Sequence, residues 1–378
     1  MNKPIRIGIL GGGQLARMSA FAAYRMGFDI AILEKIINSP AGQLTKSEFI
    51  GWVDNKKILK KFCEVSDIVT LENEFIDHKY LEYIESLGKK VIPSSKTISL
   101  IQDKLIQKQV LSSAKIPVAK FIAVDNKSDY DSISNELGNK FILKSRKMGY
   151  DGYGNSTIRN KKGYSEAIGK LKNRHSELYA EEFIHFKKEL AVMVVRTDKQ
   201  IKTYPVVETI QKKHICHTVI APADISEEIR KKTIEISIQA VKSVKGYGLF
   251  GIELFLTKDE NVLINEMAPR PHNSGHFTIE ACVTSQFENH IRSVLNLELG
   301  STEMVKPAAV MINLLGKKNG AGVISNIKET FGYDNVHLHI YGKHESRIGR
   351  KMGHITMIGE NSELLLNILS KVEKKIII

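Results

Sequence analysis

The spacing of apolar residues predicts a sheet covered by helices over the first part of the chain. Short apolar runs with the length of buried strands lie at Ile5–Leu10, Phe28–Leu33, Ile68–Leu71 and Lys90–Ile92. Helical periodicity covers Gln14–Met26 and Lys79–Leu87. Strands that alternate with helices in this way are typical of a parallel, doubly wound sheet.

The pattern changes after residue 95. It predicts one long helix at Ile98–Ala114 and another at Ser226–Lys245. Further strands are predicted at Lys120–Val124 and within 140–155, 178–184, 187–196, 203–210 and 214–222. We expect the last two to pair as antiparallel strands, and 248–270 to form a long hairpin. This α+β block is too long and too antiparallel to be the second half of a dinucleotide-binding fold.

The last part of the chain predicts a further small unit. Short strands around 308–316 and 337–343 precede a helix near the end. The predicted domains are therefore a Rossmann-like unit at 1–95, a mixed α+β unit at 96–300 and a small carboxyl-terminal unit at 301–378. The fold class is α/β and α+β, and 378 residues suffice for two or three domains.

Composition is typical of a globular protein and argues against a membrane protein and against a nucleic-acid-binding protein. Hydrophobic residues make up 42% of the chain and charged residues 26%. No apolar run reaches the roughly 18 residues of a membrane helix, so we expect no membrane partner. The formal net charge of +13 suits phosphate ligands or nucleic acid. Because the basic residues are dispersed and aromatic residues make up only 7%, we expect no nucleic-acid partner.

Cysteine usage and the amino terminus favour a cytoplasmic protein. Cys63, Cys216 and Cys282 lie far apart and predict no disulfide framework, as in a reducing cytosol. The chain passes from Met1 directly into a strand pattern, so we expect no secretory leader.

The first strand runs into a glycine-rich turn, "GGGQLARM". Residues Gly11 to Ala16 satisfy the G-x-G-x-x-G/A fingerprint of dinucleotide-binding folds. Glu34 ends the second strand, close to where such folds place a ribose-binding carboxylate. On these residues alone, an NAD-dependent oxidoreductase is one hypothesis. Another anion would serve equally, because free N–H groups at the start of a helix attract negative charge.

The hairpin within 248–270 carries two opposed glutamates. With Lys258–Asn261 as a four-residue turn, Thr257 faces Val262, Phe255 faces Ile264 and Glu253 faces Glu266. Like charges placed opposite each other destabilise a sheet unless a cation lies between them. Oxygen ligands with room for phosphate oxygens favour Mg²⁺, and Asn265 adds another oxygen. The alternative is an edge hairpin with solvated glutamates, or a register shifted by one residue.

A nucleotide held by Mg²⁺ also needs groups that bind its phosphates. The P-loop pattern G-x-x-x-x-G-K-[ST] does not occur in the sequence. A second glycine-rich segment, "GYDGYGN" at 149–155, follows Lys144 instead. Its glycines let backbone N–H groups approach phosphate oxygens closely, and Lys144 supplies a positive charge. For the glycines alone, a plain surface turn is the alternative.

Together these features resemble the ATP-grasp superfamily. More narrowly, "GILGGGQLARM", "GYDGYGN", "NEMAPRPHNSGH" and "GRKMGH" resemble the 5-(carboxyamino)imidazole ribonucleotide synthase family of purine biosynthesis. The resemblance covers nearly the whole chain, and "NEMAPRPHNSGH" is its most specific segment. It implies a Rossmann-like first domain, a central ATP-grasp domain at 96–300 and a small carboxyl-terminal domain, in a homodimer.

The resemblance implies a ligase reaction. The family combines ATP, bicarbonate and 5-aminoimidazole ribonucleotide to give ADP, phosphate and the carboxyamino product. ATP and Mg²⁺ are the implied cofactors, bicarbonate the co-substrate and a small ribonucleotide the partner. The first alternative is another ATP-grasp carboxylate–amine ligase or a formate-dependent ribonucleotide transferase, and the second is the NAD-dependent oxidoreductase.

The resemblance also implies which residues bind ATP and metal. ATP contacts are implied for Lys104, Lys144, Gly149, Tyr150, Asp151, Gly152, Tyr153, Gly154, Asn155, Glu181, Glu182, Phe183, Ile184, Glu189, Gln211, Asn265 and Glu266. Within this set, Glu181 to Ile184 would read adenine through backbone groups, and Glu189 would bind the ribose. Magnesium ligands are implied at Glu253 and Glu266.

Substrate and catalytic residues follow from the same resemblance. Substrate contacts are implied for Gly13, Gln14, Leu15, Glu72, Glu74, Asn273, Ser274, Lys343, Arg350 and Lys351, and catalytic roles for Arg270, His272 and Tyr150. The first glycine turn would then bind the ribonucleotide phosphate and not a dinucleotide. The three carboxyl-terminal cations lie in a segment with few carboxylates besides Glu345, so we expect them to bind that phosphate without local partners.

Three positions depart from the family pattern. Tyr153 stands where the family usually has Arg or Lys, so a cation near bicarbonate is missing. Gln211 stands where a His is common, and it can hydrogen-bond but cannot become charged. "LENEFID" replaces the usual E-F-E-N order, so either Glu72 or Glu74 takes the substrate role.

Overall fold

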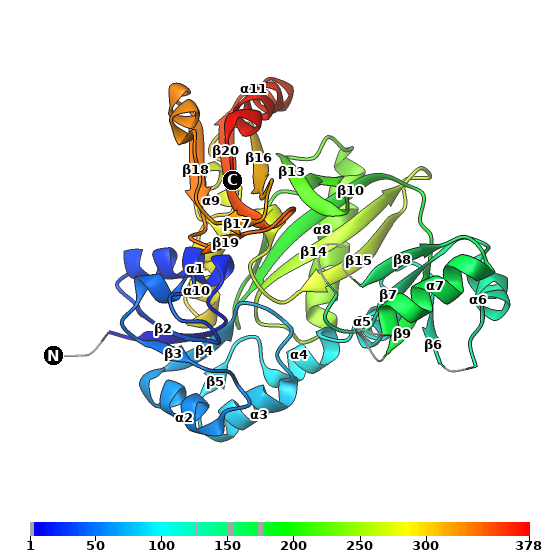
Figure 1. Cartoon of the computed structure of the whole chain (residues 1–378), viewed down its shortest axis with the longest axis horizontal. Coiled ribbons are helices and arrows are strands. Elements are labelled where there is room, and N and C mark those ends of the chain that lie inside the picture. The colour runs from blue at the N-terminus through cyan, green and yellow to red at the C-terminus, as the bar shows by residue number, and fades with distance from the viewer. Residues whose placement is uncertain (1–3, 126, 150–153, 173–176) are drawn as a thin grey trace.

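The computed structural model describes residues 4–125, 127–149, 154–172 and 177–378. Its strands form three large sheets and one two-stranded ribbon. Figure 1 shows the amino-terminal sheet at lower left, the longest sheet through the middle and a four-stranded sheet at right. The predicted combination of α/β and α+β structure is confirmed.

The amino-terminal sheet is parallel, as predicted, with the strand order β3-β2-β1-β4-β5. Its strands are β1 (Arg6–Leu10), β2 (Asp29–Glu34), β3 (Glu48–Ile50), β4 (Ile68–Leu71) and β5 (Lys90–Val91). Its helices are α1 (Gln14–Arg25), α2 (Lys56–Val65) and α3 (His78–Ser86). Ile30 and Ile32 of β2 pack with α1, whereas Ala31 and Leu33 pack with α2 and α3. Both faces are buried, so the strands are almost wholly apolar.

Two helices and a small antiparallel sheet follow. The helices are α4 (Ser95–Ile101) and α5 (Lys104–Ser113). The sheet has the order β6-β9-β7-β8, with β6 (Phe121–Val124), β7 (Phe141–Ser145), β8 (Asn155–Ile158) and β9 (Leu178–Glu182). Helices α6 (Tyr130–Leu137) and α7 (Lys161–Lys172) pack their apolar side chains against it.

The longest sheet is antiparallel and runs in the order β15-β14-β10-β12-β13-β16-β20-β18, with β11 beside β10. Its first strands are β10 (Phe186–Arg196), β11 (Ile201–Thr203), β12 (Val207–Lys212), β13 (Ile215–Ala221), β14 (Gly248–Thr257) and β15 (Val262–Ala268). The predicted pairing of 203–210 with 214–222 is confirmed by β12 and β13. Helix α8 (Glu227–Ser243) packs on the apolar face of β10, β14 and β15.

This sheet crosses the predicted boundary at residue 300, because β13 pairs with β16 (Ala308–Leu315). The strands β18 (Val336–Ile340) and β20 (Lys351–Gly359) extend it, and α11 (Ser362–Lys375) packs on β16 and β20. The remaining elements are η1 (Gly42–Leu44), η2 (Asn273–Gly275), α9 (Thr278–Ala281), α10 (Gln286–Val294), β17 (Gly320–Ala321), η3 (Ile327–Gly332) and β19 (Glu345–Ser346). Backbone hydrogen bonds therefore join the last segment to the central block, and the domain limits at 95 and 300 stay predictions.

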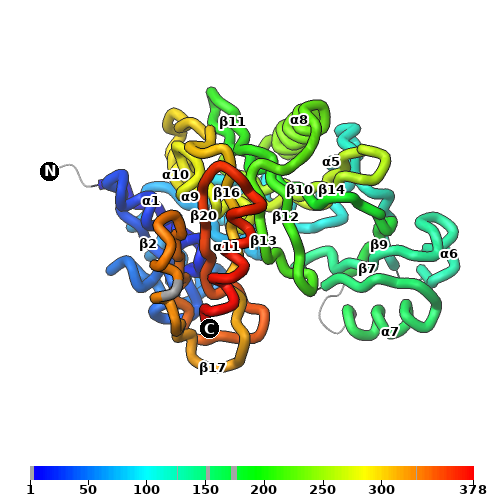
Figure 2. The backbone as a smooth tube through the Cα atoms, turned by 90° about the horizontal axis from the view of Figure 1, so that it is seen from above, coloured from blue at the N-terminus to red at the C-terminus, as the bar shows by residue number. Residues whose placement is uncertain are grey.

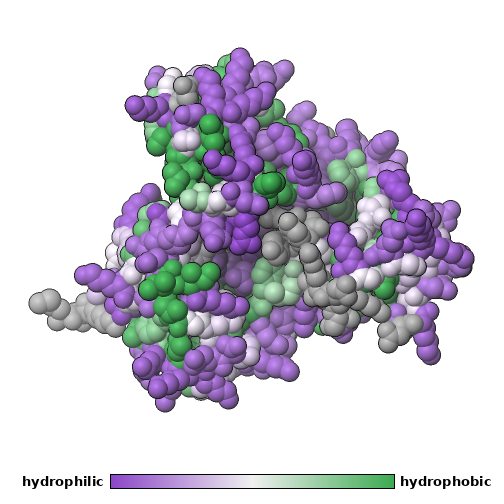
Figure 3. Space-filling model, viewed as in Figure 1, coloured by the Kyte–Doolittle hydropathy of each residue, from purple (hydrophilic) through white to green (hydrophobic). Residues whose placement is uncertain are grey.

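The elements are spread along one direction. Figure 2, seen from above, runs from α1 and β2 at one end to α6 and α7 at the other. Figure 3 shows a recess with hydrophilic walls near the centre of the face in view, below the carboxyl-terminal strands. Within the described ranges, no helix combines the length and the apolar character needed to span a membrane.

Candidate active site

Two glutamates face each other across the β14–β15 hairpin. Glu253 pairs with Glu266, which confirms the predicted opposition. Beyond this pair the predicted register is wrong by one residue, because the register shifts directly after Glu253. The observed pairs are Leu254–Ile264, Phe255–Leu263 and Leu256–Val262, in place of Phe255–Ile264 and Thr257–Val262.

The register skips Asn265, which is an extra residue in β15. Strict alternation would point Asn265 away from the face that carries Glu266, but a β-bulge redirects a side chain. Asn265 Oδ1 accepts a hydrogen bond from Lys144 Nζ at 3.2 Å, and its Nδ2 lies 3.4 Å from Glu253 Oε2. The bulge therefore brings the amide to the glutamate pair.

Burial and neighbouring charges set the ionisation of the two carboxyl groups. Burial, and then the charges of Glu266 and Glu189, raise the pKa of Glu253 to about 8. Burial also acts to raise the pKa of Glu266, but Lys104 and Lys144 outweigh it and lower that pKa to about 2. Full ionisation of both carboxyl groups at neutral pH therefore requires a further positive charge beside them.

Lys104 and Lys144 reach the glutamate pair from two separate elements. Lys104, the first residue of α5, forms an ion pair with Glu266. Lys144, on β7, forms an ion pair with Glu181 on β9, with 2.7 Å between Nζ and Oε2. The structure thus brings together both lysines that the sequence assigns to the phosphates.

Lys104 owes its place to a break in a predicted helix. The prediction of one helix over Ile98–Ala114 is wrong, because α4 ends at Ile101 and α5 begins at Lys104. The Asp103 carboxylate caps α5 by accepting hydrogen bonds from the backbone N–H groups of Leu105 and Ile106. Apolar periodicity continues across the break, so the pattern alone does not reveal the cap.

The second glycine-rich segment connects β7 to β8. Before the segment, Arg146 Nη2 and Nε donate to the Asp103 carboxylate at 2.6 and 3.1 Å, which ties the end of β7 to α5. At its end, Gly154 has a φ of +95°, which favours glycine, and its carbonyl accepts a hydrogen bond from the Ser145 N–H at 2.8 Å. The predicted roles of Tyr150, Asp151, Gly152 and Tyr153 lie outside the described residues.

The predicted adenine hinge begins on β9. The side chain of Glu181 is buried, with 3% exposed, and β9 pairs with both β6 and β7 at this residue. The backbone N–H of Glu182 donates to the Lys120 carbonyl at 2.9 Å. On the neighbouring long sheet, Glu189 accepts a hydrogen bond from Gln211, while burial raises the pKa of Glu189. The two predicted nucleotide residues on β10 and β12 therefore contact each other.

Arg270 and Glu74 form an ion pair between the central block and the amino-terminal domain. Arg270 Nε lies 2.5 Å from Glu74 Oε2, and Nη2 lies 3.1 Å from Oε1. Their side chains are 16% and 18% exposed. Of the two glutamates that the sequence leaves as alternatives, Glu74 is the one beside a predicted catalytic residue.

His272 lies against the glutamate pair, with 3.3 Å between its Nε2 and Glu253 Oε1. Its Nδ1 lies 2.8 Å from the Ser274 hydroxyl oxygen and 3.4 Å from the Ser274 backbone nitrogen. Burial, and then the charges of Arg270 and Lys351, lower the pKa of His272 to about 3. At neutral pH this imidazole is uncharged and faces Glu253.

Gln286, which sequence reasoning missed, holds the backbone of the His272 segment. This fully buried first residue of α10 accepts a hydrogen bond from His272 N at 3.0 Å and donates one to His272 O at 2.8 Å. The neighbouring Asn273 is also buried and donates from Nδ2 to Asn313 Oδ1 at 2.9 Å. No motif marks Gln286, because only the fold brings it to His272.

The first glycine turn is bound by two glutamates of the chain itself. Gly12 N donates to Glu34 Oε2 at 2.8 Å, and Gly13 N donates to Glu72 Oε2 at 2.8 Å. The backbone N–H of Leu15 donates to the other Glu72 oxygen at 3.2 Å. A Cβ at residue 13 would lie 2.2 Å from Glu72 Oε1, so the contact requires glycine. The expectation of free N–H groups here is wrong, because carboxylates occupy them.

The carboxyl-terminal cations also have partners, contrary to expectation. Lys343 Nζ donates to the Lys351 carbonyl at 2.7 Å, and Arg350 Nη1 donates to the Glu345 carbonyl at 2.7 Å. All three cations have additional interactions. The charge of Lys351 acts to lower the pKa of Glu253, so this residue lies near the glutamate pair.

The carboxyl-terminal segment meets the amino-terminal domain next to the first glycine turn. Gln43 Nε2 donates to the Gly342 carbonyl at 2.9 Å, and His344 Nε2 lies 2.7 Å from the Asn38 carbonyl. These contacts join two segments that lie about 300 residues apart in sequence.

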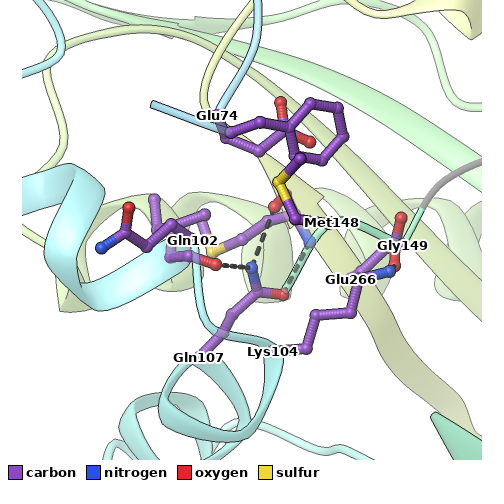
Figure 4. Close-up of a pocket in the computed structure, with 10 residues that line it drawn as sticks. Glu74, Gln102, Lys104, Gln107, Met148, Gly149 and Glu266 are labelled. Atoms are coloured by element: carbon purple, nitrogen blue, oxygen red, sulfur yellow. Dashed lines mark hydrogen bonds and ion pairs between the residues drawn. The ribbon is translucent and has the colours of Figure 1, made fainter. Parts of the chain in front are cut away.

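A cavity lies where the predicted ATP and substrate residues meet (Figure 4). Glu74 of the amino-terminal domain, Lys104 of α5, Gly149 and Glu266 line it. Gln107, another lining residue, donates from Nε2 to the carbonyls of Ile101 and Met267 at 3.2 and 3.0 Å and so fixes one wall. The amino-terminal and central parts of the chain both contribute to this cavity.

The residues present fit a divalent cation that shares its ligands with phosphate. Among the described side chains, no group of three or more His, Cys, Asp or Glu could hold a metal by itself. Glu253, Glu266 and Asn265 supply oxygens and leave room for others, as Mg²⁺ requires. The raised pKa of Glu253 supports this fit, because it marks a position where positive charge is lacking.

Models of three known domains match the chain. Residues 4–102 match the ribonucleotide synthetase preATP-grasp domain, and residues 109–287 match the ATP-grasp domain. Residues 309–368 match the phosphoribosylaminoimidazole carboxylase C-terminal domain. Their order is the one that the sequence predicts.

Relatives extend the similarity to the whole chain. A phosphoribosylaminoimidazole carboxylase from Ogataea methanolica is 41% identical over 364 residues, which is 94% of this chain and 66% of that protein. The N5-carboxyaminoimidazole ribonucleotide synthase from Bacillus subtilis is 37% identical over 354 residues, which is 93% of this chain and 91% of that protein. The chain thus spans slightly less than two thirds of the fungal relative and most of the bacterial one.

A solved structure shows the same fold. The N5-carboxyaminoimidazole synthase from Aspergillus clavatus, in complex with ADP and 5-aminoimidazole ribonucleotide, matches with a TM-score of 0.90 at 33% identity. The match covers 98% of each chain. With this structure and the Bacillus subtilis relative matched over nearly their whole lengths, the chain belongs to the N5-carboxyaminoimidazole ribonucleotide synthase family of ATP-grasp proteins.

Proposed function

We propose that this chain uses ATP and bicarbonate to carboxylate the amine of 5-aminoimidazole ribonucleotide in purine biosynthesis, with release of ADP and phosphate. One observation of the site carries the proposal: the opposed Glu253 and Glu266, with Lys104 and Lys144 beside them. Family membership supports it, because the Aspergillus clavatus relative holds ADP and this ribonucleotide.

The chemistry explains the demand for ATP. Bicarbonate is a poor electrophile, so one of its oxygens first bonds to the γ-phosphorus while the bond to ADP breaks. The amine nitrogen then bonds to the carboxyl carbon of the resulting carboxyphosphate, and phosphate leaves. The departing phosphate can accept the amine proton. Carboxyphosphate reacts with water, so the reaction requires a site that excludes water.

Phosphoryl transfer needs positive charge around the phosphates more than it needs a nucleophile. We assign this charge to Lys104 and Lys144. Glu253 and Glu266 would hold magnesium, with Asn265 beside them. When bound, magnesium would neutralise charge on the ATP phosphates.

We assign the ribonucleotide to the region between the amino-terminal domain and β20. Arg270, held by Glu74, would face the reacting centre, and Lys351 would face the substrate from the other side. His272 is neutral, so we propose that it orients the amine by hydrogen bonding and carries no charge. Because Glu72 holds the first glycine turn, the phosphate contact there would involve Gln14 or the carboxyl-terminal cations.

A homodimer and a cytoplasmic location stay predictions. The three cysteines are free, which agrees with a reducing compartment. Light scattering of the purified chain measures the oligomeric state directly.

An ADP-release assay tests the reaction. We expect full ADP formation only when bicarbonate and 5-aminoimidazole ribonucleotide are both present. Within this assay, Arg350→Ala should raise the KM for the ribonucleotide about ten- to a hundredfold, because one charge-assisted contact is lost. The KM for ATP should barely change, which is the signature of lost substrate binding.

Arg347→Ala is the matched control, since Arg347 lies in the same loop with 68% of its side chain exposed. It should leave both KM values unchanged. If Arg350→Ala raises the two KM values together, or moves neither, the carboxyl-terminal cations do not form the phosphate site.

A further inference from the structure

A third lysine lies behind the two that face the phosphates. Lys108, one helical turn after Lys104 on α5, places its Nζ 3.2 Å from Glu181 Oε1. The other oxygen of Glu181 binds Lys144 Nζ at 2.7 Å. Tyr179 completes the set, because its hydroxyl donates to Glu181 Oε1 at 2.9 Å. One carboxylate is therefore shared by two lysines.

Lys108 is enclosed by protein. Its side chain is 2% exposed, and its Nζ also donates to the Ile264 carbonyl at 3.1 Å. Burial lowers the pKa of Lys108, while the charge of Glu181 acts to raise it. Enclosed in this way, Lys108 cannot touch a nucleotide, and any effect on ligands must pass through its neighbours.

The net charge of this cluster depends on Lys108. Glu181 would otherwise pair with Lys144 alone, and the pair would have no net charge. With Lys108 present, two lysines share one carboxylate and a net charge of +1 remains. The Lys144 end of this cluster reaches Asn265 and hence the glutamate pair, so the surplus charge lies toward the candidate phosphate site.

We propose that Lys108 is a positioning residue that neutralises Glu181, so that Lys144 keeps its positive charge available for the ATP phosphates. The inference rests on the proposed function, in which Lys144 contacts those phosphates. It adds a residue that touches no ligand and that no sequence motif marks. A purely structural role, as support for β15 through the Ile264 carbonyl, is the competing explanation.

Lys108→Met tests the proposal, because methionine keeps most of the length of the side chain and removes its charge. We expect the affinity for ADP, measured by calorimetry in magnesium buffer, to fall about tenfold through the lost charge. The affinity for adenosine, which has no phosphate, should stay unchanged. Equal losses for ADP and adenosine would overturn the proposal. Lys96→Met, at an exposed position on α4, is the control and should alter neither affinity.

A compensating double variant separates charge from structure. Lys108→Met with Glu181→Gln again leaves a net charge of +1 on Lys144, so ADP affinity should return to within about threefold of the original. A structural role predicts no such recovery, and its absence would overturn the proposal. If Lys108→Met alone does not fold, the double variant is compared with Glu181→Gln, which carries one more positive charge and should bind ADP about tenfold more tightly.

Lys144→Met distinguishes failure of this inference from failure of the proposed function. If Lys144→Met leaves ADP affinity unchanged, Lys144 is not a phosphate ligand and the proposed site is wrong. If Lys144→Met weakens ADP binding and Lys108→Met does not, only the inference about Lys108 is overturned.

Discussion

The two glycine-rich segments differ in what already occupies the groups around them. At the first turn, the N–H groups of Gly12, Gly13 and Leu15 are bound by two carboxylates of the chain. On the elements that flank the second, Lys104 pairs with Glu266, and Lys108 and Lys144 share Glu181. Two carboxylates of the chain therefore already bind the first turn, whereas on the elements beside the second segment one carboxylate is shared by two lysines.

A glycine motif does not by itself predict which anion its N–H groups bind. Glycine lets N–H groups approach an anion, but the anion can come from the same chain. The first turn satisfies the dinucleotide fingerprint, yet Glu34, in the position of a ribose ligand, binds Gly12 instead. A glycine motif predicts a bound anion only where the carboxylates of the chain leave its N–H groups, or the cations beside it, without a partner.

The largest effect is expected from a substitution in the glutamate pair beside the second glycine-rich segment. Glu266→Gln removes one proposed magnesium ligand and the partner of Lys104. We expect ATP turnover, measured by ADP release, to fall about a hundredfold or more. The fold should persist, because the change also removes like-charge repulsion with Glu253.

Glu260→Gln, at an exposed position in the same hairpin, is the matched control and should turn over ATP normally. A folded Glu266→Gln protein with near-normal turnover would falsify the magnesium assignment.

A smaller effect is expected when a carboxylate that binds the first glycine turn is removed. Glu72→Ala leaves the N–H groups of Gly13 and Leu15 without their acceptor, which should lower the free energy of unfolding by about 2 kcal/mol. Inorganic phosphate should then stabilise the variant more than the original protein, because the helix start is open to an outside anion. Denaturant unfolding with and without phosphate measures both quantities.

Glu64→Ala, at an exposed position on α2, serves as the reference and should respond to phosphate as the original protein does. If Glu72→Ala is as stable as the original and gains nothing from phosphate, the carboxylate is not what closes the turn.

The smallest expected effect is none at all. NADH should not bind near Gly11 to Ala16, because Glu34 and Glu72 already occupy the turn. Calorimetric titration with millimolar NADH should give no binding heat. Micromolar binding that 5-aminoimidazole ribonucleotide does not displace would return the oxidoreductase hypothesis to first place.

Local sequence patterns predicted much of the fold for a physical reason. Residues of β2 alternate between two buried faces, and those of α1 repeat with the helical period. The order of apolar residues along the chain therefore predicts which side chains are buried. The opposition of Glu253 and Glu266 was predicted correctly although the register next to the turn was wrong by one residue, because the bulge at Asn265 compensates for the shift. The break before Lys104 escaped prediction, since a capping aspartate does not interrupt apolar spacing.

By itself, the sequence determined the strands and helices, the glutamate pair and the family, because each depends on residues close together in the chain or on specific local motifs. Only the tertiary structure decided which carboxylate meets which cation. Glu72 binds the first glycine turn, and Glu74 binds Arg270. Lys108 shares Glu181 with Lys144. Each pair lies too far apart along the sequence for local periodicity to predict the contact. Electrostatic pairing depends on distance in space and on burial, and folding alone sets both.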